Sequence, residues 1–189
     1  MLSRILLIFG IGCILFASLL VVQRTNPNRI SFNGYIPSNE TSIRYTQPTR
    51  LRLKNVAIDV PVIPAKIQNN TWQLTDKGIS YLATSPLPGQ RGNSIMYGHN
   101  WASILGNLDK TKIGQEIEVD FANNTTKYFT ITGILVVNPS NTSVLLPSTD
   151  NRLTLYTCTG FFDTKRLVIT AVLKPSLPLC PKDQKYCVI

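Results

Sequence analysis

The sequence predicts an all-β domain, either a closed barrel or a sandwich, behind an apolar N-terminal segment. Three features of composition favour β structure. Thr, Val, Ile and Asn recur along the chain, and 43% of residues are hydrophobic while only 15% are charged. The chain also contains 12 Pro and 11 Gly, which suit the turns between many short strands. About 140 residues remain after the N-terminal part, enough for one hydrophobic core.

The apolar segment at residues 5–22 reads ILLIFGIGCILFASLLVV and contains no charge. A helix of this length measures about 27 Å, close to the thickness of the hydrocarbon layer. A cleaved signal peptide is the alternative, but a small-x-small cleavage site is poorly matched. We expect residues 1–24 to be a retained transmembrane anchor. Basic residues flank both ends of the segment, so the distribution of positive charge does not decide its orientation. We expect the N-terminus inside the cell, because a large domain follows the segment and because the chemistry described below requires that domain to be outside.

Polar segments lie on either side of the predicted domain, which spans residues 50–174. Residues 25–49 are rich in Asn, Ser, Thr, Arg and Pro, which is typical of an extracytoplasmic spacer. Residues 175–189 form a tail in which Cys180 and Cys187 would close a small disulfide loop in an oxidising compartment. Two free thiols are an equal alternative.

The predicted domain contains short apolar or alternating runs separated by turn residues such as Pro88-Gly89 and Asn123-Asn124. Short helical turns are expected at residues 76–82 and 102–108. The expected strands are residues 51–58, 60–63, 94–98, 116–121, 127–137, 152–158 and 166–173.

Two scarce residue types stand at the ends of these runs. His99 is the only histidine of the chain, and Cys158 is the only cysteine between the apolar segment and the tail. A thiol must lose a proton to attack a carbonyl and a leaving amine must gain one, so a Cys with a nearby His can make both transfers. With ordinary pKa values of about 8.5 and 6.5, few such pairs hold a thiolate and an imidazolium together at pH 7.

Arg166 begins an otherwise apolar run. A fixed cation at a strand end is suited to stabilising the oxyanion of a tetrahedral intermediate. From the residues alone, an exposed Arg at the end of a strand is an equal alternative.

Three motifs resemble those of the sortase family. The run TLYTC at residues 154–158 is similar to the signature Thr-Leu-x-Thr-Cys. Gly98-His99 after an apolar strand resembles the family's histidine motif, and Arg166 before Leu-Val-Ile resembles its arginine strand. The resemblance covers residues 51–173 in the right order, and it implies an eight-stranded β-barrel with short helices.

The resemblance also implies a cysteine transpeptidase. Cys158 would attack the bond after Thr in a motif similar to Leu-Pro-x-Thr-Gly, His99 would move the protons, and Arg166 would hold the substrate and the oxyanion. Thr157 and Trp101 are expected at the substrate site. The implied partners are surface proteins with a C-terminal sorting motif and an amine acceptor, either wall peptide or pilin lysine. The short connection from Cys158 to Arg166 is similar to that of class D, E or F enzymes.

Several other functions are less consistent with the sequence. The net charge is +9, but the basic residues are scattered and no nucleic-acid-binding motif is present. The acidic residues are few and spread, so we expect no metal and no cofactor. An L,D-transpeptidase would have its His shortly before the nucleophile, whereas His99 precedes Cys158 by 59 positions. A non-catalytic, membrane-tethered β-domain that binds wall polymers or a partner protein remains the alternative.

Overall fold

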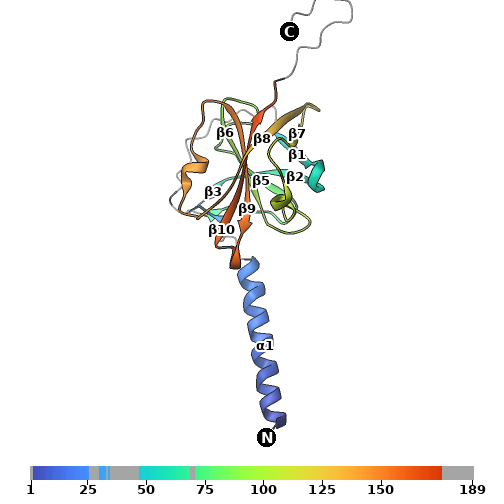
Figure 1. Ribbon diagram of the computed structural model, residues 1–189, viewed down its shortest axis with the longest axis vertical. Coiled ribbons are helices and arrows are strands. Elements are labelled where there is room, and N and C mark those ends of the chain that lie inside the picture. Colours follow the sequence, from blue (N-terminus) through green and yellow to red (C-terminus); the bar gives the residue numbers. More distant parts are fainter. Residues whose placement is uncertain (1, 26–29, 33, 35–46, 69–70, 176–189) are drawn as a thin grey trace, which may run out of the picture.

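The computed structural model describes residues 2–25, 30–32, 34, 47–68 and 71–175. The Cys180 and Cys187 pair and most of the expected spacer lie outside these residues. The apolar segment forms α1 (Leu2–Thr25), which extends away from the β-domain (Figure 1). Its Arg4–Val22 window is long and apolar enough to cross a membrane, and no part of that window is buried.

Eight strands form a closed barrel in the order β1-β2-β5-β6-β9-β10-β8-β7, with β7 paired to β1. Neighbours are antiparallel except for the parallel pairs β2–β5 and β6–β9. Closure pairs both edges of the sheet, and it confirms the predicted eight-stranded barrel. The barrel strands are β1 (Pro48–Leu53), β2 (Ile58–Ala65), β5 (Ile79–Leu82), β6 (Gly92–Gly98), β7 (Glu116–Phe121), β8 (Thr126–Val137), β9 (Asn151–Thr159) and β10 (Lys165–Leu173).

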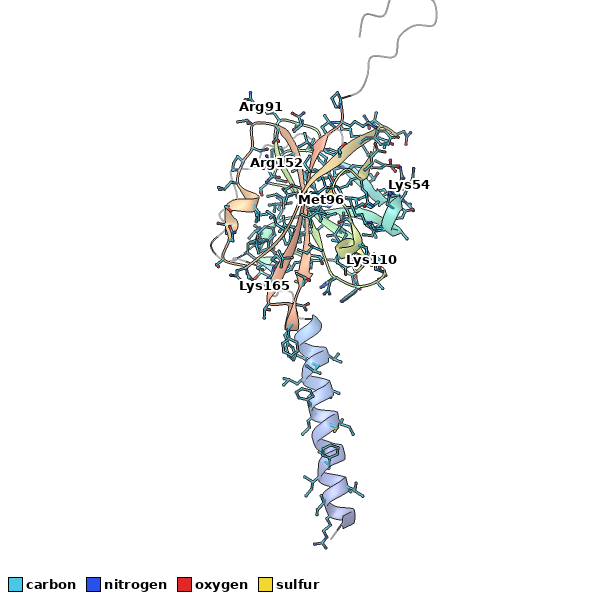
Figure 2. All side chains as sticks on the ribbon, viewed as in Figure 1. Lys54, Arg91, Met96, Lys110, Arg152 and Lys165 are labelled. Carbon is cyan, nitrogen blue, oxygen red and sulfur yellow. The ribbon has the colours of Figure 1, made fainter. Side chains whose placement is uncertain are left out.

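The barrel has apolar residues on both faces of its central strands. Met96, in the middle of the domain (Figure 2), packs with Leu155 and Ile169 inside the barrel. Tyr97 and Tyr156 alternate with them and lie on the outer face, where a second apolar cluster forms. The small sheet of β3 (Ile67–Gln68) and β4 (Thr71–Trp72) contributes Trp72 to this outer cluster.

Two local expectations differ from the structure. The expected strand at residues 51–58 ends at Leu53, because the 3₁₀ turn η2 (Lys54–Val56) and the left-handed Ala57 (φ 54°) redirect the chain into β2. The helical turn expected at residues 76–82 is wrong, because Ile79–Leu82 form β5. All four β5 residues are buried, so no alternation marks the strand. At residues 102–108, turns lead into η3 (Leu108–Lys110). The remaining short helices are η4 (Thr142–Leu145) and η5 (Phe161–Asp163).

Candidate functional site

Strand pairing brings the three predicted site residues to one end of three consecutive strands. Cys158 is directly opposite Arg166 in the antiparallel β9–β10 pair. In the parallel β6–β9 pair Gly98 is opposite Thr157, so His99, directly after β6, follows Gly98 as Cys158 follows Thr157 on β9. Opposite residues in antiparallel pairs have Cα atoms about 5 Å apart. The barrel therefore gathers residues that are far apart in the sequence.

Cys158 lies on the outer face of the barrel and is 8% exposed. Two residues earlier, Tyr156 stacks on Tyr97 with ring centroids 5.5 Å apart and an interplanar angle of 17°. Cys158 and Tyr156 both belong to the outer apolar cluster. The thiol is thus placed by a rigid, paired strand and not by a loop.

His99 follows β6 and lies against Trp101. The two rings stack with centroids 4.3 Å apart and an interplanar angle of 7°. Burial lowers the pKa of His99 below its ordinary value, while the carboxylates of Asp163 and Asp76 oppose that shift. His99, Trp101 and Asp76 line a pocket of about 570 Å³. The neutral imidazole is favoured at this site, and two acidic groups limit that preference.

The loop after His99 has a fixed path. The Leu105 amide donates to the His99 carbonyl at 3.1 Å, and the Gly106 amide donates to the Trp101 carbonyl at 2.7 Å. A Cβ on Gly106 would come within 2.8 Å of that Trp101 carbonyl oxygen. Gly106 therefore permits the close approach that holds Trp101 against His99.

Arg166 is 3% exposed, and four backbone carbonyls surround its guanidinium group. Nη1 donates to the carbonyls of Asp163 and Lys165, each at 3.0 Å. Nε donates to the Ile30 carbonyl at 3.3 Å, and Nη2 donates to the Ser31 carbonyl at 3.0 Å. Four of the five N–H donors of the guanidinium thus go to neutral carbonyls, the kind of acceptor that a substrate carbonyl would also provide.

Residues 30–32, here called segment 30–32, were expected to belong to the spacer, but they pack on the domain. Ile30 and Phe32 are 2% and 3% exposed. The Phe32 ring meets Tyr156 edge-on with centroids 4.9 Å apart. The sequence signal for this contact is weak: two apolar residues that alternate around Ser31 in a polar stretch.

Sequence reasoning also missed Asp163, the only acidic residue between Cys158 and Arg166. Its carboxylate accepts a hydrogen bond from Asn100 Nδ2 at 3.1 Å, which joins the β9–β10 turn to the loop after His99. Asp163 has a left-handed backbone with φ 57°. Asp163 therefore links the turn that precedes Arg166 to the loop that follows His99.

The two residues expected at the substrate site have different positions. Trp101 lies beside His99 in the same pocket. Thr157 differs from the expectation, since it is 2% exposed and its hydroxyl donates to the Gly98 carbonyl at 2.8 Å. Strand alternation directs Thr157 away from the face that carries Cys158. Its hydroxyl braces β9 against β6 just before His99.

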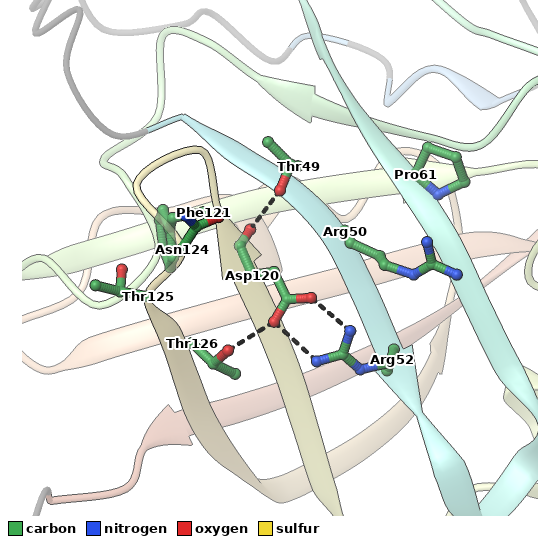
Figure 3. A pocket seen from close by; sticks show the side chains of 9 residues that line it. All are labelled: Thr49, Arg50, Arg52, Pro61, Asp120, Phe121, Asn124, Thr125 and Thr126. Atoms are coloured by element: carbon green, nitrogen blue, oxygen red, sulfur yellow. Dashed lines mark hydrogen bonds and ion pairs between the residues drawn. The ribbon is translucent and has the colours of Figure 1, made fainter.

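A separate hollow lies between β1 and β7 (Figure 3). Asp120 lies at its centre, paired with Arg52 and accepting a hydrogen bond from Thr126 at 2.7 Å. Arg50, on the rim, is paired with Asp59 at 2.5 Å. Because these charges already neutralise one another, the hollow is better explained as an ion-pair network that joins β1 to β7 than as a binding site.

Comparison with known proteins identifies the family. A family model described as the Sortase domain matches residues 51–174. A search of curated proteins finds no match. Solved structures that are similar include the Corynebacterium diphtheriae sortase A lid mutant, with 24% identity, TM-score 0.61 and coverage of 69% of this chain and 72% of that chain.

Two further structures are comparably similar. Sortase C1 of Streptococcus agalactiae is 26% identical, with TM-score 0.58 and coverage of 68% of this chain and 67% of that one. A Clostridium perfringens sortase D5 transpeptidase is 22% identical, with TM-score 0.58 and coverage of 68% and 79%. Because the family model matches residues 51–174, which include nearly all of the barrel, the chain belongs to the sortase family of cysteine transpeptidases.

Proposed function

We propose that this protein is a membrane-anchored sortase whose domain lies outside the cytoplasm. It cleaves a Thr-Gly-like bond in a motif similar to Leu-Pro-x-Thr-Gly and transfers the acyl group to an amine of the cell wall or of a pilin. One observation carries the assignment of the site: the register places Arg166 opposite Cys158 and Gly98-His99 beside Thr157.

The proposed reaction needs a thiolate and an imidazolium. The Cys158 sulfur forms a bond to the carbonyl carbon of the substrate Thr, and the oxyanion develops near the Arg166 guanidinium. The C–N bond then breaks as His99 gives its proton to the leaving amine, which leaves a thioester. The incoming amine forms the new C–N bond and gives its proton to His99, and the C–S bond breaks to restore the thiolate.

Arg166 must change partners for this reaction to occur. The carbonyls of Ile30 and Ser31 lie where a substrate oxygen would have to approach the guanidinium. The Asp163 and Lys165 carbonyls come from the turn and strand that carry Arg166 itself. We therefore infer that substrate displaces the first pair, while the second pair keeps the guanidinium in place.

The pocket beside His99 suits the amine acceptor. It is lined by His99 and Trp101 and by the adjacent Asp76 and Lys77, whose opposite charges offset one another. The amine must reach His99 before it can lose a proton, so a pocket lined by His99 itself is the appropriate entry side.

The test is intact-mass analysis of the full chain in detergent micelles, incubated with Leu-Pro-x-Thr-Gly-like and Leu-Ala-x-Thr-Gly-like peptides, with and without triglycine. We expect an acyl adduct on Cys158 that triglycine resolves into a ligated peptide, and no adduct with Cys158→Ala or His99→Ala. Arg166→Lys should lower turnover by about 10²-fold or more, because an ammonium group cannot replace the planar guanidinium.

Three results would contradict the proposal. An adduct in Cys158→Ala would exclude this nucleophile, and near-normal turnover by Arg166→Lys would exclude the role of Arg166. A folded protein that gives no adduct with any peptide, and whose Cys158 is alkylated no faster than a denatured thiol, would favour the binding-domain alternative.

A further inference from the structure

Two aromatic side chains project from the turn between β9 and β10. Phe161 is 83% exposed and Phe162 is 41% exposed, and their rings meet edge-on with centroids 4.3 Å apart. Phe162 has a left-handed backbone with φ 51°, which is unfavourable for a bulky residue. The turn thus holds apolar surface outward at a conformational cost, which suggests that this surface has a partner.

This turn lies at the end of the domain that faces α1. Figure 1 shows the β9–β10 turn beside the end of α1 that leads into the domain. Figure 2 places Lys165, the first residue of β10, at the same end.

Chain connectivity supports this placement independently of the view. α1 ends at Thr25, and the Ile30 carbonyl is hydrogen-bonded to Arg166. The five residues from Thr25 to Ile30 can span at most about 18 Å. While segment 30–32 is bound, the β9–β10 end of the barrel must stay close to the end of α1.

We propose that Phe161 and Phe162 insert into the headgroup region of the membrane that α1 spans, and hold the mouth of the Cys158 and Arg166 site at the membrane surface. This inference rests on the proposed function, because it takes α1 to be the anchor. Aromatic side chains beside a cationic one are typical of interfacial membrane contacts. Lys165 is exposed at the base of the turn, with its Nζ 2.7 Å from the neutral Asn138 Oδ1, so its charge favours anionic lipid.

The contact has a consequence for substrate choice. A protein substrate that is itself held in the membrane by an apolar segment presents the residues next to that segment at the membrane surface. An active site held at the same distance from the membrane encounters such a motif at a higher effective concentration than it encounters a motif free in solution. The aromatic pair would therefore favour membrane-held substrates over soluble peptides with the same motif.

The first test is photo-crosslinking of the full chain in vesicles of phosphatidylglycerol and phosphatidylcholine. p-Benzoylphenylalanine replaces Phe161 in one protein and Tyr128 in the control. Tyr128 is 42% exposed, and its carbonyl accepts from the Lys174 amide at the opposite end of β10, about 26 Å from Arg166 along the strand. We expect about fivefold more lipid adduct at position 161 than at position 128. Equal lipid adducts, no lipid adduct at position 161, or crosslinks from position 161 mainly to a second copy of the chain would overturn the proposal.

The second test compares two substrates in the same vesicles: a soluble sorting-motif peptide, and the same motif followed by an apolar membrane-spanning segment. Phe161→Ser should slow cleavage of the membrane-held substrate by about three- to tenfold and change cleavage of the soluble peptide by less than about twofold. Tyr128→Ser should change neither. Equal effects of Phe161→Ser on both substrates, or none on either, would argue against the proposal. If the unmodified protein cleaves neither substrate, the proposed function fails, and the lipid crosslinks alone decide the membrane contact.

Discussion

At the scale of single residues, His99 is subject to opposing influences on its pKa. Burial against Trp101 favours the neutral imidazole, whereas the carboxylates of Asp163 and Asp76 favour the imidazolium. The proposed reaction needs the imidazolium as an acid for the leaving amine. The balance between burial and these two charges therefore sets the fraction of molecules that are competent at neutral pH.

The charge of Asp163 can be removed while its shape is kept. In Asp163→Asn, we expect the pKa of His99 to fall further below its ordinary value, because the carboxylate no longer stabilises the imidazolium. Asn tolerates the left-handed backbone at this position. His99 is the only histidine, so its ring protons report the pKa directly in an NMR titration.

The same substitution should lower the plateau of the pH–rate profile and move its acid limb to lower pH. An ordinary thiol titrates above an ordinary imidazole, so the fraction of molecules that hold a thiolate and an imidazolium together falls as the pKa of His99 falls. Asp109→Asn, in η3, serves as a control for the removal of one negative charge. An unchanged or raised His99 pKa in Asp163→Asn would show that Asp163 does not act on His99 through its charge.

At the scale of elements, segment 30–32 lies between α1 and β1 in the sequence and packs on the barrel at the proposed site. Its carbonyls occupy two donors of Arg166, and Phe32 packs against Tyr156 and Trp72 on the outer face of the barrel. In the described structure the chain therefore occupies part of its own proposed site. Release of segment 30–32 would free the guanidinium for a substrate carbonyl.

Loss of the Phe32 ring should favour that release. We expect Phe32→Ala to increase the rate at which iodoacetamide alkylates Cys158 by about tenfold. A tenfold ratio corresponds to about 1.4 kcal/mol, and removal of a buried aromatic ring destabilises the packed segment by more than that. Intact-mass time courses on the full chain measure the rate. Phe9→Ala makes the same change in α1, on an exposed ring, and should leave the rate unaltered. Equal or slower alkylation in Phe32→Ala would mean that the segment does not restrict access to Cys158.

At the scale of the whole molecule, ion pairs join the first barrel strands to β7. Glu118 on β7 is 7% exposed. Its carboxylate forms ion pairs with Lys54 Nζ at 2.5 Å and with Arg52 Nε at 3.0 Å. Arg52 also pairs with Asp120. Hydrogen bonds and charge from Lys54 and Arg52 lower the pKa of Glu118. Its carboxylate therefore stabilises the fold above the pKa of the unfolded chain, and this contribution is lost as pH falls through the lower, folded pKa.

This network predicts a particular acid response. The thermal midpoint of the chain should fall as pH decreases from about 5 to about 3, with a smaller fall in Arg52→Met. At neutral pH, Arg52→Met should reduce the free energy of unfolding by roughly 1 to 3 kcal/mol, because it leaves Glu118 and Asp120 with fewer partners.

Arg91→Met is the matched control, since the Arg91 side chain is exposed and its Nε donates to a backbone carbonyl of Thr149. Circular dichroism melts at several pH values measure all three proteins. Identical pH dependence in Arg52→Met and in the unmodified chain would contradict a role for these pairs in closing the barrel.

The sequence by itself determined the features that depend on neighbouring residues. Alternating and apolar runs predicted seven of the barrel strands, because strand periodicity is a local property. The run TLYTC and the single histidine identified Cys158 and His99 as site candidates for the same reason. β5 was missed because both of its faces are buried, so its four residues show no alternation.

Only the tertiary structure decided which distant groups meet. Arg166 and Ile30 are 136 positions apart, and their hydrogen bond depends on the path of the whole chain around the barrel. Asp163 reaches Asn100 through a left-handed turn that no local pattern specifies. Phe161 is exposed, and the β9–β10 turn that carries it lies beside the end of α1 (Figure 1); this position likewise follows from how the strands close and not from the residues around it. Such contacts depend on the summed packing of all the strands, and for that reason composition and spacing could not predict them.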